Sequence, residues 1–262
     1  MVLTIRKIRK FRDGIAERVV DMILIGIYFN LEAPSLIQKK RYLIESSVEE
    51  DLEKLNYHRI KRACSFLKRK GLIDFVKEKE ILPIITKAGE LKLRKIIPFY
   101  DEKRVWDGQI YLVSYDFPKD KNKERDYFRK FLRDIGCGML QQSNWLTPYN
   151  PTNLIKKFIE KHELSGDLIL ISSIGKNGMI GTKTLKELME KVFLLSHLNL
   201  RYREFVYKAK SGKEKRGELI YLFLSILNED PQIPFSFLPD DWLGEEAYVL
   251  FKKLRLMRPL NN

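Results

Sequence analysis

The first hundred residues place apolar side chains at helical spacing, and then in two short runs typical of strands. The spacing predicts an amphipathic helix over residues 16–31, and Pro34 predicts that this helix ends there. Two shorter helices are expected over residues 36–44 and 48–56. The second of these follows a Ser-Ser pair, and serine is a favourable residue at the start of a helix.

A fourth helix is predicted over residues 57–70. Ile60, Ala63, Cys64 and Leu67 fall at positions i, i+3, i+4 and i+7, which makes one apolar stripe that faces a core. The opposite face is polar and mostly basic. Its side chains are the candidate DNA contacts: His58, Arg59, Lys61, Arg62, Ser65, Lys68 and Arg69.

Two short apolar runs, residues 72–76 and 81–86, flank a charged turn and predict a two-stranded hairpin. Thr86 is expected to cap the helix that follows. Helices, a basic helix and a hairpin in this order predict a winged helix-turn-helix over residues 1–100. In that fold the basic helix enters the major groove, and the hairpin tip, here with Lys77 and Lys79, contacts phosphates.

Residues 101–180 alternate strands and helices in the order β-α-β-β-α-β, which predicts a ferredoxin-like domain. The first strand is expected over residues 109–115. An amphipathic helix follows, with Asp120 as its expected cap and Gly136 as its end. The remaining elements are expected as a strand pair near residues 139–146, a helix over 152–162 and a strand over 167–172.

From residue 181 to residue 262 the pattern is mostly helical. Apolar residues between Leu185 and Leu198 share one face and predict a helix. A basic loop over residues 208–216 is expected to separate it from a buried helix over 219–227, and a last helix is expected over 245–256. The predicted fold class is α+β: an N-terminal winged helix-turn-helix, a central ferredoxin-like domain and a mostly helical C-terminal domain.

The charge of the chain favours a polyanionic partner. Lys and Arg number 49 against 35 Asp and Glu, which gives a net charge of +14. Residues 1–104 alone carry 24 Lys and Arg against 15 Asp and Glu, a net charge of +9. Double-stranded DNA is the expected partner, because a cationic surface releases counterions from it. A basic surface that is merely solvated is the alternative.

Other classes of protein are disfavoured by the sequence. No stretch approaches the roughly 20 apolar residues that span a bilayer, and the N-terminus has no apolar secretory signal. Cys64 and Cys137 lie far apart and the three histidines are scattered, so neither a zinc site nor a disulfide framework is expected. We therefore expect a cytoplasmic protein without a cofactor.

Three segments resemble the PaaX-type transcriptional repressors, which are named for the control of phenylacetate degradation. They read WDGQIYLVSYDFP (106–118), QQSNWLTPYNP (141–151) and DPQIPFSFLPDDWLGEEAYVLFKKL (230–254). The resemblance implies a sequence-specific regulator, expected to be a repressor, that occupies operator DNA as a homodimer. It also implies a small-molecule effector of the acyl-CoA type.

The central block also resembles the small CRISPR-associated endonuclease of the spacer-acquisition complex. That family has a strand ending in Tyr-Asp, a basic helix, a Gly and a Gln-x-Ser-aromatic stretch. These correspond here to Tyr115-Asp116, residues 125–133, Gly136 and residues 141–145. In that family the strand-end Asp, paired with its copy in a second protomer, is the proposed Mg²⁺ ligand.

The second resemblance makes Asp116 the candidate metal ligand and catalytic residue, although Asp in a strand-to-helix turn is often structural. A Mg²⁺-dependent endonuclease, or a CRISPR-type scaffold that binds nucleic acid, is therefore the alternative function. A winged helix that binds protein rather than DNA is a third possibility. It predicts weak DNA binding that does not depend on salt, whereas phosphate contacts depend on salt steeply.

Overall fold

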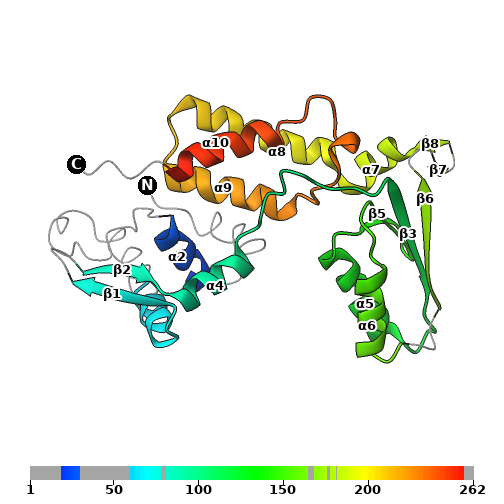
Figure 1. Ribbon diagram of the computed structural model, residues 1–262, viewed down its shortest axis with the longest axis horizontal. Helices are drawn as coiled ribbons and strands as arrows, with labels where there is room; N and C mark the ends of the chain where they lie inside the picture. The colour runs from blue at the N-terminus through cyan, green and yellow to red at the C-terminus, as the bar shows by residue number, and fades with distance from the viewer. Residues whose placement is uncertain are drawn as a thin grey trace, which may run out of the picture. The chain divides into compact units, whose positions relative to one another are not determined.

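The computed structural model describes residues 19–29, 60–77, 81–164, 168–175, 178–180 and 182–256 (Figure 1). The helices predicted over residues 36–44 and 48–56 lie outside the described residues, as do His58, Arg59 and Lys79. The complete winged helix-turn-helix therefore stays a prediction, while its second half can be compared with the structure.

Two compact units make up the chain. The first contains Met1–Tyr100, Arg201–Asp230 and Leu243–Asn262, and the second contains Asp101–Leu200 and Pro231–Trp242. Segments far apart in the sequence thus share a unit. The boundaries of the three predicted sequence domains, 1–100, 101–180 and 181–262, stay a prediction.

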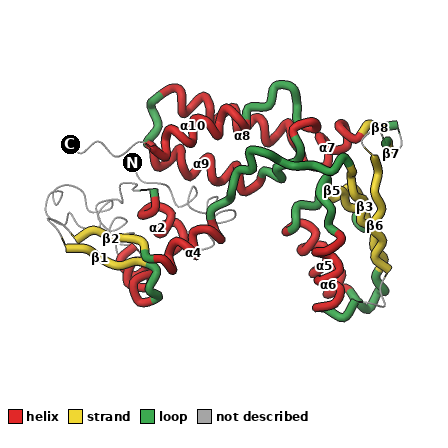
Figure 2. The backbone as a smooth tube through the Cα atoms, viewed as in Figure 1, coloured by secondary structure: helices red, strands yellow, loops and turns green. Residues whose placement is uncertain are grey.

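The first unit combines a helix, a basic helix, a hairpin and a further helix with three long helices from the C-terminal part of the chain (Figure 2). Residues 60–69 form the basic helix. The other elements are α2 (Val19–Tyr28), β1 (Ile73–Lys77), β2 (Ile81–Ile85), α4 (Lys87–Ile96), α9 (Arg216–Glu229) and α10 (Gly244–Leu256), together with the part of α8 (Leu195–Ser211) from Arg201 onward. The predicted hairpin and the helix after it are confirmed, and β1 and β2 are antiparallel.

The basic helix ends in a turn that sets the direction of the hairpin. Gly71 has a φ of +66°, a left-handed conformation that favours glycine. The Leu72 amide donates to the Leu67 carbonyl (2.9 Å) and the Gly71 amide donates to the Lys68 carbonyl (2.8 Å). This is the Schellman arrangement, which satisfies carbonyls that the helix leaves without partners.

Thr86 joins the hairpin to this turn and to α4. Its Oγ accepts a hydrogen bond from the Gly89 amide (3.1 Å) and donates to the Gly71 carbonyl (2.6 Å). The cap predicted for Thr86 is thus confirmed, and it also ties α4 to the end of the basic helix. Gly89 is required there, because a Cβ on it would lie 2.1 Å from the Leu72 carbonyl oxygen.

The second unit contains a four-stranded antiparallel sheet in the order β4-β5-β3-β6. Both neighbours of β3 run antiparallel to it, as in the predicted split β-α-β arrangement. The bounds are β3 (Gln109–Asp116), α5 (Asn122–Asp134), β4 (Gly138–Gln141), β5 (Asn144–Thr147), α6 (Thr152–Lys161) and β6 (Leu168–Gly175). The predicted β-α-β-β-α-β order is confirmed.

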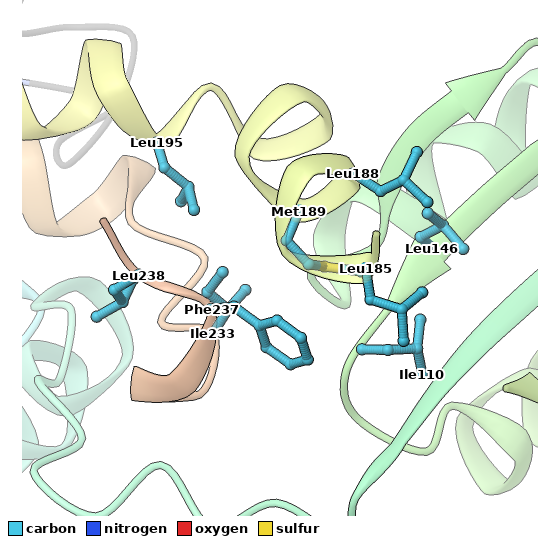
Figure 3. Close-up of a cluster of buried hydrophobic side chains, with 9 residues drawn as sticks. All are labelled: Ile110, Leu146, Leu185, Leu188, Met189, Leu195, Ile233, Phe237 and Leu238. Carbon is cyan, nitrogen blue, oxygen red and sulfur yellow. The ribbon is translucent and has the colours of Figure 1, made fainter. Parts of the chain in front are cut away.

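Each face of this sheet has its own core, because neighbouring strand residues point to opposite faces. Val113 and Trp145 pack against Phe128 of α5 and Ile155 of α6. On the other face, Ile110 and Leu146 pack against α7 (Leu185–Phe193) and against the Pro-rich segment before α10 (Figure 3). That segment includes the short helix η1 (Phe235–Phe237).

Several predicted details are wrong. Leu194 takes a left-handed conformation (φ 51°) and ends α7, so the helix predicted over residues 185–198 is two helices. Residues 208–211 belong to α8 rather than to a basic loop. Asp120 does not cap α5, which begins after Lys121 without a side-chain cap. A small hairpin, β7 (Met179–Ile180) with β8 (Lys183–Thr184), precedes α7 and was not expected.

Gly89→Ala is predicted to destabilise the first unit by about 1–3 kcal/mol, because the added Cβ has to displace backbone at Leu72. The free energy of unfolding in urea measures the effect. Gly175→Ala is the matched control, since a Cβ at Gly175 meets nothing within 4 Å. Equal stability of the two variants would contradict the close packing of α4 on the turn.

Candidate nucleic-acid interface

The basic helix turns its cationic side chains to solvent. Ala63 and Leu67 are buried, 6% and 0% exposed, and they define its inner face. The predicted apolar stripe is therefore confirmed for these positions. The exposed positions within the described part of the helix are Lys61, Arg62, Ser65, Lys68 and Arg69.

Lys61 and Arg62 stand near the N-terminal end of this exposed face. Neither side chain forms a hydrogen bond or an ion pair with any other residue that the structure describes. Their charges are thus not neutralised by described carboxylates and can act on an external anion. The Ser65 hydroxyl donates to the Lys61 carbonyl (2.8 Å), which leaves its oxygen lone pairs as acceptors.

Two aromatic rings lie under the cations at the other end of the helix. The Lys68 ammonium lies 5.2 Å from the centre of the Phe75 ring, which belongs to β1. The Phe66 ring lies 5.7 Å from the Arg69 guanidinium and 5.8 Å from the Lys70 ammonium. Cation–π contacts at such distances restrict the cations and hold them beside the hairpin.

Lys70 and the two rings were missed by the sequence analysis. Lys70 follows the last helical residue and is exposed. Its position next to Arg69 could have suggested it. The pairing of Lys68 with Phe75 could not have been found from spacing, because it depends on how the hairpin folds back.

The hairpin tip is only partly described. Lys77 is the last residue of β1 and is paired in register with Ile81 of β2. Lys77 therefore stands where the strands end and the tip begins. Contacts of Lys77 and Lys79 with phosphates stay predictions.

Asp116 is exposed at the last position of β3, opposite Leu168 of β6. Among the described residues, no group of three or more His, Cys, Asp or Glu side chains is arranged to hold a metal ion. Mg²⁺ takes octahedral oxygen coordination, so Asp116 alone could supply only part of its ligands. The role of Asp116 as a metal ligand and catalytic residue therefore stays a prediction.

The polar residues of the first family-like segment, residues 106–118, form hydrogen bonds that stabilise the start of β3. Asp107 accepts hydrogen bonds from the Gln109 amide (2.9 Å) and from the Tyr111 hydroxyl (2.6 Å). The Trp106 indole donates to the Gln109 carbonyl (2.7 Å). These bonds fix the entry into β3.

The second segment is bound to the first in the same way. The Ser114 hydroxyl donates to the Asn144 side chain (2.7 Å), and the Tyr115 hydroxyl donates to the Gln142 carbonyl (2.8 Å). Arg129 of α5 donates to the Tyr115 hydroxyl (2.9 Å). The Gln-x-Ser-aromatic stretch therefore has a structural role in this chain.

Comparison with known proteins identifies the family. Residues 103–187 match the central Cas2-like domain of PaaX protein, and residues 193–258 match the C-terminal domain of PaaX-like protein. The chain belongs to the PaaX-like proteins. Comparison of this PaaX-like chain with curated proteins gives no match.

A solved structure is similar to this PaaX-like protein along most of both chains. It is an uncharacterized protein from Mycobacterium tuberculosis, Rv0674, with a TM-score of 0.53 and 12% sequence identity, and the match covers 89% of this chain and 92% of that one. At this identity the similarity concerns the fold alone. Within the described residues, no helix is long and apolar enough to cross a membrane.

The tail of the PaaX-like signature packs on the Cas2-like domain of this protein. The Tyr149 hydroxyl donates to the Gln232 carbonyl (2.6 Å), and Arg104 donates to the Ile233 carbonyl (3.0 Å). Arg104 is 2% exposed, so residues 101–104 are anchored rather than a loose linker. Pro231–Trp242 therefore belongs to the same packed unit as the Cas2-like domain.

The reactivity of the Cys64 thiol reports how closely the basic helix packs against the rest of the first unit. Burial raises the pKa of its thiol above the usual range, so less reactive thiolate is present at neutral pH than for an exposed cysteine. Alkylation by iodoacetamide should be slower than for a cysteine in a short unfolded peptide, and its rate should keep rising at pH values where the rate for the peptide has levelled off.

Cys137 should react more slowly still, because burial raises its pKa to about 12. Mass spectrometry of the alkylated protein identifies the labelled residue, and Cys64→Ser is the control. Alkylation of Cys64 as fast as in the peptide would show that its side of the helix is not packed.

Proposed function

We propose that this PaaX-like protein is a sequence-specific DNA-binding transcriptional regulator, acting as a repressor and binding its operator as a homodimer. The observation that carries the proposal is the exposed basic face of residues 60–69, which stands directly before an antiparallel hairpin. A helix followed by a hairpin is the second half of a winged helix-turn-helix. Family membership supports the proposal, because PaaX-like proteins include transcriptional repressors.

We expect one end of the basic face to contact base edges and the other end to contact phosphates. In helix-turn-helix proteins the N-terminal residues of the recognition helix contact base edges. Arg62 lies near that end, and its guanidinium fork matches the O6 and N7 acceptors of guanine. Lys68, whose ammonium lies over the Phe75 ring beside the hairpin, would contact a phosphate. Bases would thus be read near Arg62, and the register would be fixed by Lys68 and the wing.

A dimer would place two such helices in successive major grooves, with a spacing set by its two-fold symmetry. The net charge of +14 favours association with DNA at long range. The resemblance to the PaaX-type repressors adds a small-molecule effector of the acyl-CoA type to the proposal. If the protein responds to such an effector, an added acyl-CoA should release it from bound DNA.

The proposal is tested by the binding of genomic and random duplex fragments over a range of salt, with and without Mg²⁺. Selective retention of intact fragments that weakens steeply with salt is the expected result. Binding that is weak and independent of salt would favour a module that contacts protein. Equal retention of all fragments would contradict the proposal that the protein recognises a specific sequence.

Arg62→Ala should lower the affinity for the selected operator by about 1–3 kcal/mol and relax the preference at one base pair, because a bidentate contact to guanine is lost. Fluorescence anisotropy with the operator and with single-base variants measures both effects. Lys157→Ala, which removes an exposed cation from α6, is the control and should bind as the wild type does. An unchanged base preference would remove Arg62 from the interface.

Lys68→Met should weaken binding to all sequences alike and reduce the slope of log affinity against log salt by about one, since one phosphate contact is lost. Phe75→Leu should reproduce part of this effect because it removes the ring under the ammonium, and Phe75→Tyr should not. Additive effects in the double variant Lys68→Met/Phe75→Leu would indicate that the ring and the ammonium act independently.

The alternative function rests on the Cas2-like match and on the exposed carboxylate of Asp116. It requires two copies of Asp116 to come together, as in a two-fold dimer. Shortening of DNA that needs Mg²⁺ and disappears in Asp116→Asn would favour an endonuclease. Intact DNA under the same conditions would leave the regulator as the function.

A further inference from the structure

The helix α2 is attached to α9 and α10 by polar contacts that join opposite ends of the sequence within the first unit. Arg216, the first residue of α9, donates through Nε to the Leu254 carbonyl (2.8 Å) and through Nη1 to the Phe29 carbonyl (2.9 Å). Phe29 directly follows α2, and Leu254 lies near the end of α10. The C-terminal ends of helices carry unpaired carbonyls and partial negative charge. One guanidinium therefore binds two helix ends together.

Tyr221 makes a second attachment one turn further along α9. Its hydroxyl donates to the Met22 carbonyl of α2 (2.6 Å). Gly26 leaves space for this approach, since a Cβ there would lie 3.2 Å from the Tyr221 oxygen. Burial raises the pKa of Tyr221, so the hydroxyl remains a donor at neutral pH.

Side chains of α10 complete the attachment. Arg255 donates to the Tyr28 hydroxyl (3.0 Å), and Phe251 meets the Phe29 ring edge to face at 6.0 Å between centroids. Four residues, Arg216 and Tyr221 of α9 and Phe251 and Arg255 of α10, thus contact α2 and the Phe29 that follows it. The attachment is directional, because it uses hydrogen bonds to specific backbone carbonyls.

From α2 the contacts continue toward the basic helix. α2 packs against β2 and α4, and the buried carboxylate of Asp21 pairs with Lys92 of α4 (3.5 Å). α4 is in turn bound through Thr86 to the Gly71 carbonyl, at the end of the basic helix. An unbroken series of contacts therefore connects α9 to residues 60–69.

We propose that Arg216 and Tyr221 are positioning residues, through which the C-terminal helices hold the DNA-binding segment in one orientation. This inference rests on the proposed function and adds to it a role for α9 and α10. A recognition helix that is held rigidly can engage a second half-site at high effective concentration, whereas a loosely attached one gains little from the second half-site. The C-terminal helices thus contribute to the choice of operator spacing without touching DNA.

The first measurement needs no DNA. Hydrogen–deuterium exchange of the full-length protein should be faster in peptides of α2 and α4 in Arg216→Met and in Tyr221→Phe, and unchanged in the sheet of the second unit. Lys253→Met is the matched control, because it removes an exposed cation of α10. Unchanged exchange of α2 in both variants would overturn the attachment itself, whether or not the protein binds DNA.

The second measurement compares duplexes that carry one half-site or two. Arg216→Met and Tyr221→Phe should bind the single half-site with the affinity of the wild type, within about twofold. The increase in affinity that the second half-site gives should be smaller in both variants by about tenfold or more. Arg216→Lys should lie between, since an ammonium lacks the fork that spans two carbonyls. If the second half-site raises the affinity of these variants as much as that of the wild type, although the amides of α2 exchange faster, the positioning role would be overturned. A wild-type protein that binds neither duplex would instead refute the proposed function.

Discussion

The carbonyl group of Leu72 is the point where the basic helix, the hairpin and α4 meet in the segment that we propose binds DNA. It accepts the Thr86 amide (3.2 Å), and it lies where any side chain on Gly89 would have to go. The basic helix ends there, the hairpin returns there and α4 begins there. Because the helix, hairpin and α4 cannot move independently at this turn, the exposed cations keep a fixed relation to the hairpin. Binding of DNA by helix and wing together requires this relation.

The central domain uses its polar signature for a different purpose. Asp107, Ser114 and Tyr115 are engaged in hydrogen bonds within the sheet and with α5. The Pro-rich tail packs on the same unit through Gln232 and Ile233. Residues 106–118, residues 141–151 and the Pro-rich part of residues 230–254 thus all contribute to the packing of one sheet. The polar residues of these segments thus account for the fold of the Cas2-like region, and a chemical role of Asp116 stays a proposal.

The sequence pattern predicted the features that depend on residues close together in the chain. The stripe through Ala63 and Leu67, the cap at Thr86 and the strand order of the sheet follow from periodicity and turn residues. The break at Leu194 was missed, because no Gly or Pro marks it and a leucine rarely adopts a left-handed conformation. Arg216 could not be recognised either, since its partner Phe29 lies 187 residues away in the sequence. Its role depends on tertiary packing, which spacing along the chain does not contain.

The proposed function requires that the exposed face of residues 60–69 contacts DNA. Acetylation of lysines with and without operator DNA, read by mass spectrometry, tests it residue by residue. We predict that DNA protects Lys61 and Lys68, while Lys156 and Lys157 of α6 are modified as in the unbound protein. Protection of the α6 lysines with none at Lys61 and Lys68 would contradict it and would place nucleic acid on the Cas2-like domain.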